Sequence, residues 1–331
     1  MEAANAAADE KLLKLCIIDL MKEVEILTSN LSITTFNIDW YTTLENFLED
    51  YREIGLDTLE LNGRVTRRVI EELFPHIEKG IIKISSLHNY CPKIEIAEED
   101  GVQLSALDEE TRKLAVQHTK VTIETARMVG AKAVVLHTGS VEGLKTLMNE
   151  LKELYQAGKK DSMEYNDIRN RLIEQRKNDR EKYASACEKS LIELSEFISR
   201  KNFDIKLGLE NRLNHGEIPI VTEYDEWFDK YCDLPIFLWY DYGHGEVQHN
   251  LGLIDKNEIF HRHGKRLLGL HIHDCEGIND HILPGTGTIK FDFIKDHLRP
   301  DVLRVLEYGK KIKPIGKIPE GIEYLRKTGI L

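Results

Sequence analysis

The feature of this sequence that most constrains its fold is a repeat: short aliphatic and β-branched runs recur eight times, separated by stretches with helical spacing. The runs are almost wholly apolar, which is typical of parallel strands covered by helices. The expected strands are Leu31–Phe36, Asp57–Leu61, Ile81–Leu87, Lys132–His137, Ile205–Glu210, Ile236–Asp241, Leu267–Ile272 and Leu303–Glu307. Eight such units predict an α/β fold closed into a (β/α)₈ TIM barrel, which commonly takes about 250 residues or more.

Two segments do not fit the repeat. Residues 1–30 are expected to form an amphipathic N-terminal helical extension ahead of a catalytic barrel domain at 31–331. The connection after the fourth strand is about twice the length of a normal barrel crossover. Residues 142–200 within it are rich in Lys, Glu and Leu and predict an inserted helical hairpin. Its charge pattern favours a solvated face or a dimer contact, with a substrate lid as the alternative.

Composition limits the class of protein. Of 331 residues, 41% are hydrophobic and 31% charged, which favours a large core over disorder. The net charge of −12 disfavours binding to nucleic acid. Five cysteines, an odd number without a C-x-x-C pair, indicate reduced thiols and a cytoplasmic location. Charged residues interrupt the apolar run near the amino end far below membrane-spanning length, so no membrane association is expected.

Polar residues stand at the carboxyl ends of seven expected strands, and in a barrel those ends converge on one rim. A single such residue is more often a loop anchor, so the prediction depends on the set: Glu60, His88, His137, Glu210, Asp241, His271 and Glu307. All but Glu60 are candidate metal ligands, because a cation would neutralise carboxylates crowded together away from water. His244 and His281 bring the candidates to eight.

Mixed imidazole and carboxylate ligands suit Zn²⁺, Mn²⁺, Co²⁺ or Fe²⁺ better than Mg²⁺ or Ca²⁺. His273 shares a strand face with His271, so it is expected either to orient a ligand or to contact substrate. No G-x-S-x-G motif supports acyl transfer. The Gly285–Gly287 turn lacks the flanks of a nucleotide-binding loop.

The sequence resembles the xylose-isomerase-like TIM-barrel superfamily, which includes sugar isomerases and epimerases and the apurinic-site endonucleases of the endonuclease four type. The resemblance runs from about Leu31 to Glu307. Its motifs are Leu136-His-Thr-Gly139, Leu209-Glu-Asn-Arg212, Trp239-Tyr-Asp-Tyr-Gly-His244, Leu270-His-Ile-His-Asp274, Asp280-His-Ile-Leu-Pro-Gly-Thr-Gly287 and Val305-Leu-Glu307.

In the sugar branch, the resemblance implies one divalent ion, of Mn, Zn or Co, held by Glu210, Asp241, His271 and Glu307. The two glutamates would also be the catalytic acid and base, moving a proton through a metal-stabilised enediolate. The implied substrate is a small sugar, and the chain could form a homo-oligomer. The expected substrate contacts are His88, His137, Arg212, His244, His273 and Trp239.

In the endonuclease branch, the same four ligands belong to a three-zinc cluster completed by His88, His137, His244, His281 and an Asp two residues before that last His. Position 279 is Asn279, and the adjacent Asp280 is in a different phase, so one ligand of the third zinc is expected to be absent or displaced. Sugar chemistry is therefore favoured over phosphodiester cleavage. A lyase or dehydratase acting on an oxidised sugar or glycoside is a third possibility.

Overall fold

The computed structural model describes residues 31–94, 102–308 and 315–331. The predicted helical extension at 1–30 lies outside the described residues. Within these ranges no helix is both long and apolar enough to span a bilayer.

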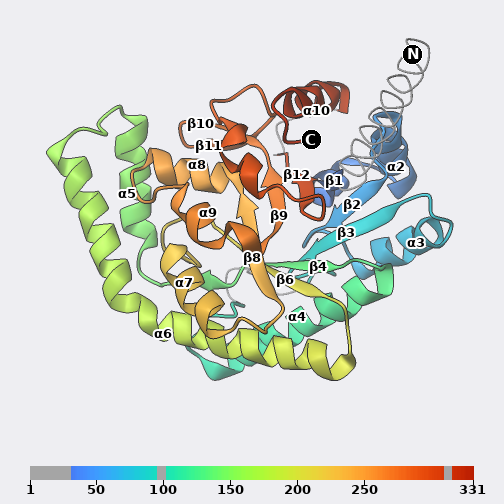
Figure 1. Cartoon of the computed structure of the whole chain (residues 1–331), viewed down its shortest axis with the longest axis horizontal. Helices are drawn as coiled ribbons and strands as arrows, with labels where there is room; N and C mark the ends of the chain where they lie inside the picture. The colour runs from blue at the N-terminus through green and yellow to red at the C-terminus, as the bar shows by residue number, and fades with distance from the viewer. Residues whose placement is uncertain (1–30, 95–101, 309–314) are drawn as a thin grey trace, which may run out of the picture.

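Eight parallel strands close into a barrel in the order β1-β12-β9-β8-β6-β4-β3-β2 (Figure 1). The predicted TIM barrel is therefore confirmed. The strands are β1 Leu31–Thr34, β2 Thr58–Leu61, β3 Lys83–His88, β4 Ala133–Leu136, β6 Lys206–Glu210, β8 Ile236–Asp241, β9 Leu267–Ile272 and β12 Leu303–Leu306. β8 and β9 have the predicted bounds, and the others differ by one or two residues at one end or, for β3 and β4, at both ends.

Two short antiparallel sheets lie outside the barrel and are not predicted from the sequence. β5 (Gly139–Ser140) pairs with β7 (Glu217–Ile218), and β10 (Asp274–Glu276) pairs with β11 (Asn279–Ile282). Both follow barrel strands on the carboxyl-end side. They therefore form part of the wall around the rim where the candidate ligands were expected.

Helices cover the outside of the barrel. They are α2 Leu44–Glu53, α3 Arg67–Glu78, α4 Glu109–Val129, α5 Lys145–Gln156, α6 Met163–Lys201, α7 Val221–Lys230, α8 Tyr242–Asn250, α9 Glu258–His263 and α10 Ile318–Lys327, with 3₁₀ turns η1 Thr35–Trp40, η3 Gly264–Arg266, η4 Phe291–His297 and η5 Ile315–Lys317. Local sequence signals determine where some of these helices begin and end. The Thr43 hydroxyl accepts from the Asn46 amide to begin α2. Gly130, with φ of 81°, ends α4 in the left-handed conformation that glycine adopts readily.

The predicted hairpin at 142–200 is formed by α5 and α6. The α6 helix has 39 residues and packs against both α5 and α4. In Figure 1 it runs along the outside of the molecule, with one end beside α5 and the other beneath the barrel. The insertion therefore extends a covering helix of the barrel instead of forming a separate body.

The barrel interior is filled by Trp239, whose side chain has no exposed surface. The neighbouring strands carry Gly208 and Gly269 where the indole lies: a Cβ on Gly269 would come within 2.3 Å of the ring, and one on Gly208 within 2.9 Å. Ala133, Val135, Leu268 and Val305 complete this inner cluster. A layer of apolar side chains thus closes the barrel below the rim.

Candidate metal centre

The candidate ligands follow from the two-residue period of the strands. Side chains two apart on a strand share a face. Val135, Trp239 and Val305 point into the barrel, so His137, Asp241 and Glu307 lie in the next layer up, at the rim. The alternation that fills the barrel also collects the polar groups above the apolar layer.

Four of these groups form a central cluster. Ligand atoms of Glu210, Asp241, His271 and Glu307 all lie within 4.8 Å of one another, and all four residues are buried. The His271 Nδ1 atom is 2.9 Å from Glu210 Oε1, 3.2 Å from Glu307 Oε2 and 3.8 Å from Asp241 Oδ2. The structure brings together the four residues that the resemblance implies as ligands of one ion.

The electrostatics of this cluster are those of a cation site. Burial opposes the charge on His271, but Glu307, Glu60 and Glu210 outweigh it and raise its pKa well above the ordinary value. Burial raises the pKa of Glu210, but Arg212, His137 and His271 together hold it well below its usual range. The protonated His271 ring thus offsets part of the negative charge of the buried Glu307, Glu60 and Glu210 carboxylates. A divalent ion bound at His271 Nδ1 would offset more of this charge, because it carries two positive charges. The donor set fits such an ion.

A second cluster contains His88, His137 and Glu210. The His137 Nε2 atom lies 2.7 Å from Glu210 Oε2 and 2.8 Å from Arg212 Nη1. Burial and the Arg212 charge lower the pKa of His137 to about 4, despite Glu210. The ring is therefore neutral near pH 7, the form in which an imidazole nitrogen can bind a metal ion or accept a hydrogen bond.

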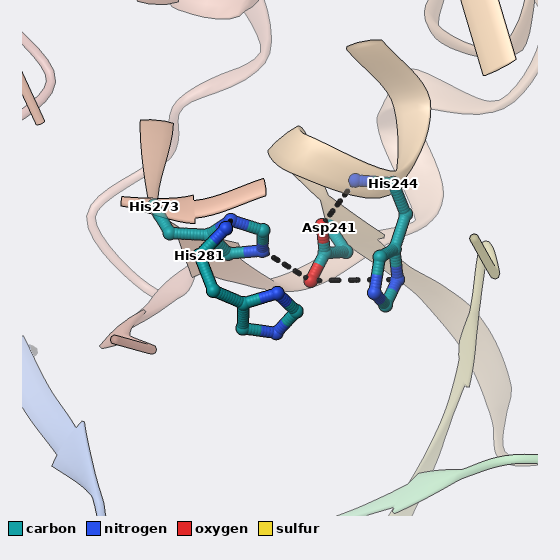
Figure 2. Close-up of side chains that lie close together, drawn as sticks. All are labelled: Asp241, His244, His273 and His281. Carbon is teal, nitrogen blue, oxygen red and sulfur yellow. Dashed lines mark hydrogen bonds and ion pairs between the residues drawn. The ribbon is translucent and has the colours of Figure 1, made fainter. Parts of the chain in front are cut away.

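A third cluster joins Asp241 to His244, His273 and His281 (Figure 2). The His281 amide donates to His273 Nδ1 at 2.8 Å, so that nitrogen is unprotonated. In the neutral ring the proton is then on Nε2, which donates to Asp241 Oδ2 at 2.9 Å. With both nitrogens occupied, His273 orients Asp241, which is one of its two predicted roles.

Asp280 lies beside the third cluster and brings a second carboxylate next to its histidines. Its Oδ2 atom is 3.1 Å from His281 Nδ1 and 3.9 Å from His244 Nε2. That oxygen is buried and accepts no hydrogen bond within the described part of the chain. The β10–β11 pairing shifts register, and His281 has φ of 57°, so sequence phase alone could not place this residue. A carboxylate displaced by one position along the sequence thus lies beside two histidines of the third cluster.

Glu60, which was not predicted as a metal ligand, is fully buried beside two of the candidate ligands, His271 and His88. Its Oε1 atom is 3.0 Å from His271 Nε2 and 3.4 Å from His88 Nε2. Burial raises the pKa of Glu60, but His271 and His88 outweigh this and hold it below its usual range. Glu60 thus hydrogen-bonds to His271 Nε2, while His271 Nδ1 faces the other candidate ligands. In metal sites, such a partner on the second nitrogen fixes the orientation of a histidine ring. The sequence signal that could have identified Glu60 as part of the site was its position at the end of an expected strand.

The residues predicted to contact substrate do not all reach the open side of the centre. Trp239 packs edge-on against His271, with ring centroids 5.2 Å apart and no exposed surface, so it supports the site from below. His273 is also fully covered. Neither can line a substrate pocket in this structure. Arg212 and His137 retain exposed side-chain surface beside Glu210, whereas His88 and His244 retain less.

Comparison with known proteins identifies similar chains. A family model described as "Xylose isomerase-like TIM barrel" matches residues 48–328. An uncharacterised protein of Sinorhizobium fredii, y4fM, is 25% identical over 241 residues, which are 69% of this chain and 64% of that protein. The match therefore spans less than two thirds of the curated relative.

Solved structures share the fold at low sequence identity. A D-tagatose 3-epimerase-like protein superposes with a TM-score of 0.61 at 20% identity, covering 91% of this chain and 98% of that one. The 3-keto-D-glucoside 4-epimerase YcjR of E. coli gives 0.61 at 17% identity, with 90% and 99% covered. The IOLI protein, solved with a zinc atom, gives 0.60 at 18% identity, with 91% and 96% covered.

Proposed function

The chain belongs to the xylose isomerase-like TIM barrel family, and from that premise we propose that it is a divalent-metal-dependent isomerase or epimerase of a sugar or sugar derivative. The observation that carries the proposal is the central cluster of Glu210, Asp241, His271 and Glu307, converging from the ends of four strands. Structural neighbours that are named as sugar epimerases support the same reading.

The four residues of the central cluster would hold the ion. When bound, a divalent ion would polarise the sugar carbonyl and favour loss of the proton on the adjacent carbon. Within the chain, Glu60 holds the His271 ring, and His273 holds Asp241. Both ligands are therefore oriented by buried groups that do not themselves face the substrate.

Glu210 and Glu307 differ in the number of partners that hold their carboxylates and in their exposure. Glu210 is almost fully covered and is held by Arg212 at 2.6 Å, His137 at 2.7 Å and His271 at 2.9 Å. Glu307 contacts His271 at 3.2 Å and keeps about 10% of its side chain exposed. We assign removal of the proton to Glu307, which has fewer partners and then carries that proton. A different proton, delivered from solvent through Glu210, would be added on the other side of the carbon, and the proton on Glu307 would return to solvent.

Deuterium incorporation tests the proposal without knowledge of the product. The protein is loaded with Mn²⁺, Co²⁺ or Zn²⁺ and incubated in D₂O with a panel of ketoses, keto-glycosides and their phosphates, and carbon-bound deuterium is measured by NMR. We expect exchange with at least one compound that stops when a chelator removes the metal. Exchange that continues in Glu307→Gln would contradict the assignment of the base.

A second candidate function, phosphodiester cleavage at abasic sites in DNA, is favoured by one observation. Asp280 places a second carboxylate beside the third cluster, and the central cluster shares Glu210 with the second cluster and Asp241 with the third. Incubation with an abasic duplex at low salt, where electrostatic binding is strongest, tests it. Nicking that requires zinc and is absent in Asp280→Asn would place cleavage ahead of sugar chemistry; intact duplex would remove it.

A further inference from the structure

The insertion at 142–200 is joined to the loop that follows β6. Arg176 on α6 is 2% exposed, and its guanidinium donates to the backbone oxygens of His215 at 2.6 Å and Glu217 at 3.2 Å. It also pairs with Glu223 on α7 at 2.9 Å. A buried bidentate pair with two backbone bonds restrains both partners. The insertion thus fixes the position of a loop at the rim.

That loop leads directly to the metal centre. Glu217 accepts from Arg212 Nε at 3.2 Å, and its other oxygen accepts from the Asn214 backbone amide at 2.7 Å and side-chain amide at 2.9 Å. Arg212 in turn donates to Glu210 at 2.6 Å. The charged side chains of this loop, Arg212 and Glu217, therefore have hydrogen-bond partners within the loop and the metal centre. The Asn214 side-chain oxygen faces the insertion instead.

Lys152 on α5 meets that oxygen and has no anionic partner. Its half-buried ammonium donates to Asn214 Oδ1 at 2.8 Å, and no carboxylate in the described ranges lies within ion-pair distance. An ammonium has three donors, so two remain. Burial lowers the pKa of Lys152, opposed by Asp280 and Glu217. Those carboxylates already pair with His281 and Arg212.

The surroundings place this ammonium at the edge of the third cluster. α5 packs beside the β10–β11 sheet, where a Cβ on Gly277 would come 3.5 Å from the Tyr155 ring. In Figure 1 α5 lies alongside α8, β10 and β11. The same sheet carries Asp280 and His281. A molecule reaching the metal centre from this side would meet a positive charge that no carboxylate in the described ranges pairs with directly, because Asp280 and Glu217 act on it only from beyond ion-pair distance.

We propose that Lys152 binds an anionic group of the substrate, a phosphate or a carboxylate, while the rest of the molecule faces the metal centre. This inference rests on the proposed function and assigns its substrate to the acidic sugar derivatives. It also gives the insertion a role in recognition. A cation held by a neutral partner gains most from an anion that completes its hydrogen bonds.

Anion binding to the metal-free protein tests the inference. The chelator-treated and dialysed protein is titrated with inorganic phosphate and, separately, with acetate, by calorimetry. Wild type is expected to bind at least one of them. Lys152→Met should bind about tenfold more weakly, since a hydrogen bond between charged groups contributes that factor or more. Lys152→Gln should bind the anion as weakly as Lys152→Met, whereas Lys152→Arg should bind it as tightly as wild type.

The matched control is Lys189→Met, which removes an exposed lysine of α6 that bonds Glu109 and should leave binding unchanged. Preference for phosphate would indicate a phosphorylated sugar, and preference for acetate a sugar acid. Equal binding by Lys152→Met and wild type would overturn the inference, as would wild type that binds neither anion at tens of millimolar. Because neither metal nor turnover is involved, the outcome is independent of the deuterium test.

Discussion

The barrel strands and the helical insertion contribute to one site in different ways. At the strand ends, backbone geometry alone brings Glu210, Asp241, His271 and Glu307 together. In the insertion, Lys152 and Arg176 reach the site through long side chains that contact the loop after β6. Rigid strands hold the groups that need fixed geometry, whereas the insertion supplies groups that would distinguish substrates. Changes in the two regions should therefore have different effects.

The largest effect is expected at a strand end. Glu307→Gln keeps the shape of the side chain but removes the proposed base, so exchange or turnover should fall about a thousandfold, within the range for general base catalysis. The thermal unfolding midpoint should stay near that of wild type. Glu323→Gln, an exposed change on α10, is the control. Undiminished exchange in Glu307→Gln would show that the strand ends do not carry the proton transfer.

Inside the barrel, Gly269→Ala is expected to destabilise the fold. The new Cβ would come within 2.3 Å of the Trp239 ring, and an overpacked interior costs about 3 kcal/mol or more in free energy of unfolding. Urea unfolding of the metal-free protein measures it. Gly316→Ala, where no atom lies within 4 Å of the added Cβ, is the control. Equal stability of the two variants would mean that Trp239 does not support the rim.

The loop held by Arg176 should show a pH dependence of its own. Burial and the Arg176 charge lower the pKa of His215 from 6.5 to about 4. The unfolded chain takes up this proton first, so stability is lost as the pH falls from 6.5 towards 4. The loss corresponds to about 2 to 3 kcal/mol. His215→Gln should remove this part of the loss in metal-free protein, measured by urea unfolding at both ends of the range.

The control for that measurement is His249→Gln, an exposed change on α8. If the pH dependence of His215→Gln and wild type coincide, the His215 ring is not held in its neutral form, and the loop is less closely packed against the insertion than the contacts of Arg176 indicate.

The smallest of these effects is expected at Glu60, which contacts His271 but is not one of the four proposed metal ligands. Glu60→Gln keeps a buried acceptor for His271 Nε2 but removes the negative charge. Metal affinity should fall about tenfold, as for other partners of ligand histidines. Competition with a coloured chelator measures it, and Glu71→Gln on the exposed face of α3 is the control. Unchanged affinity would assign Glu60 to packing alone.

The strands and the central cluster were predictable because their signals are local. An apolar run and its terminal polar residue, such as Val135 and His137, specify a strand and its inward face together. Glu60 has the same position but was set apart, because a sequence does not show that a carboxylate meets the far side of a histidine ring. The full burial of Trp239 could not be predicted from the sequence, because its fit depends on Gly208 and Gly269 of neighbouring strands.

The remaining features depend on contacts between distant segments. Asp280 reaches its cluster through a shifted hairpin register and the positive φ of His281, and neither can be read from spacing. Lys152 and Arg176 lie on helices whose charge pattern resembles a solvated surface. Only the folded position of the 211–217 loop shows that both side chains contact it.

Metal content is the most direct test of the account. Wild type and Asp241→Asn are loaded with Mn²⁺, Co²⁺ or Zn²⁺, desalted, and analysed for bound metal per chain. Asp241 belongs to both the central and the third cluster, so wild type should retain at least one ion and the variant should lose it. Wild type that retains no metal after loading, or a variant that retains as much as wild type, would contradict the metal centre.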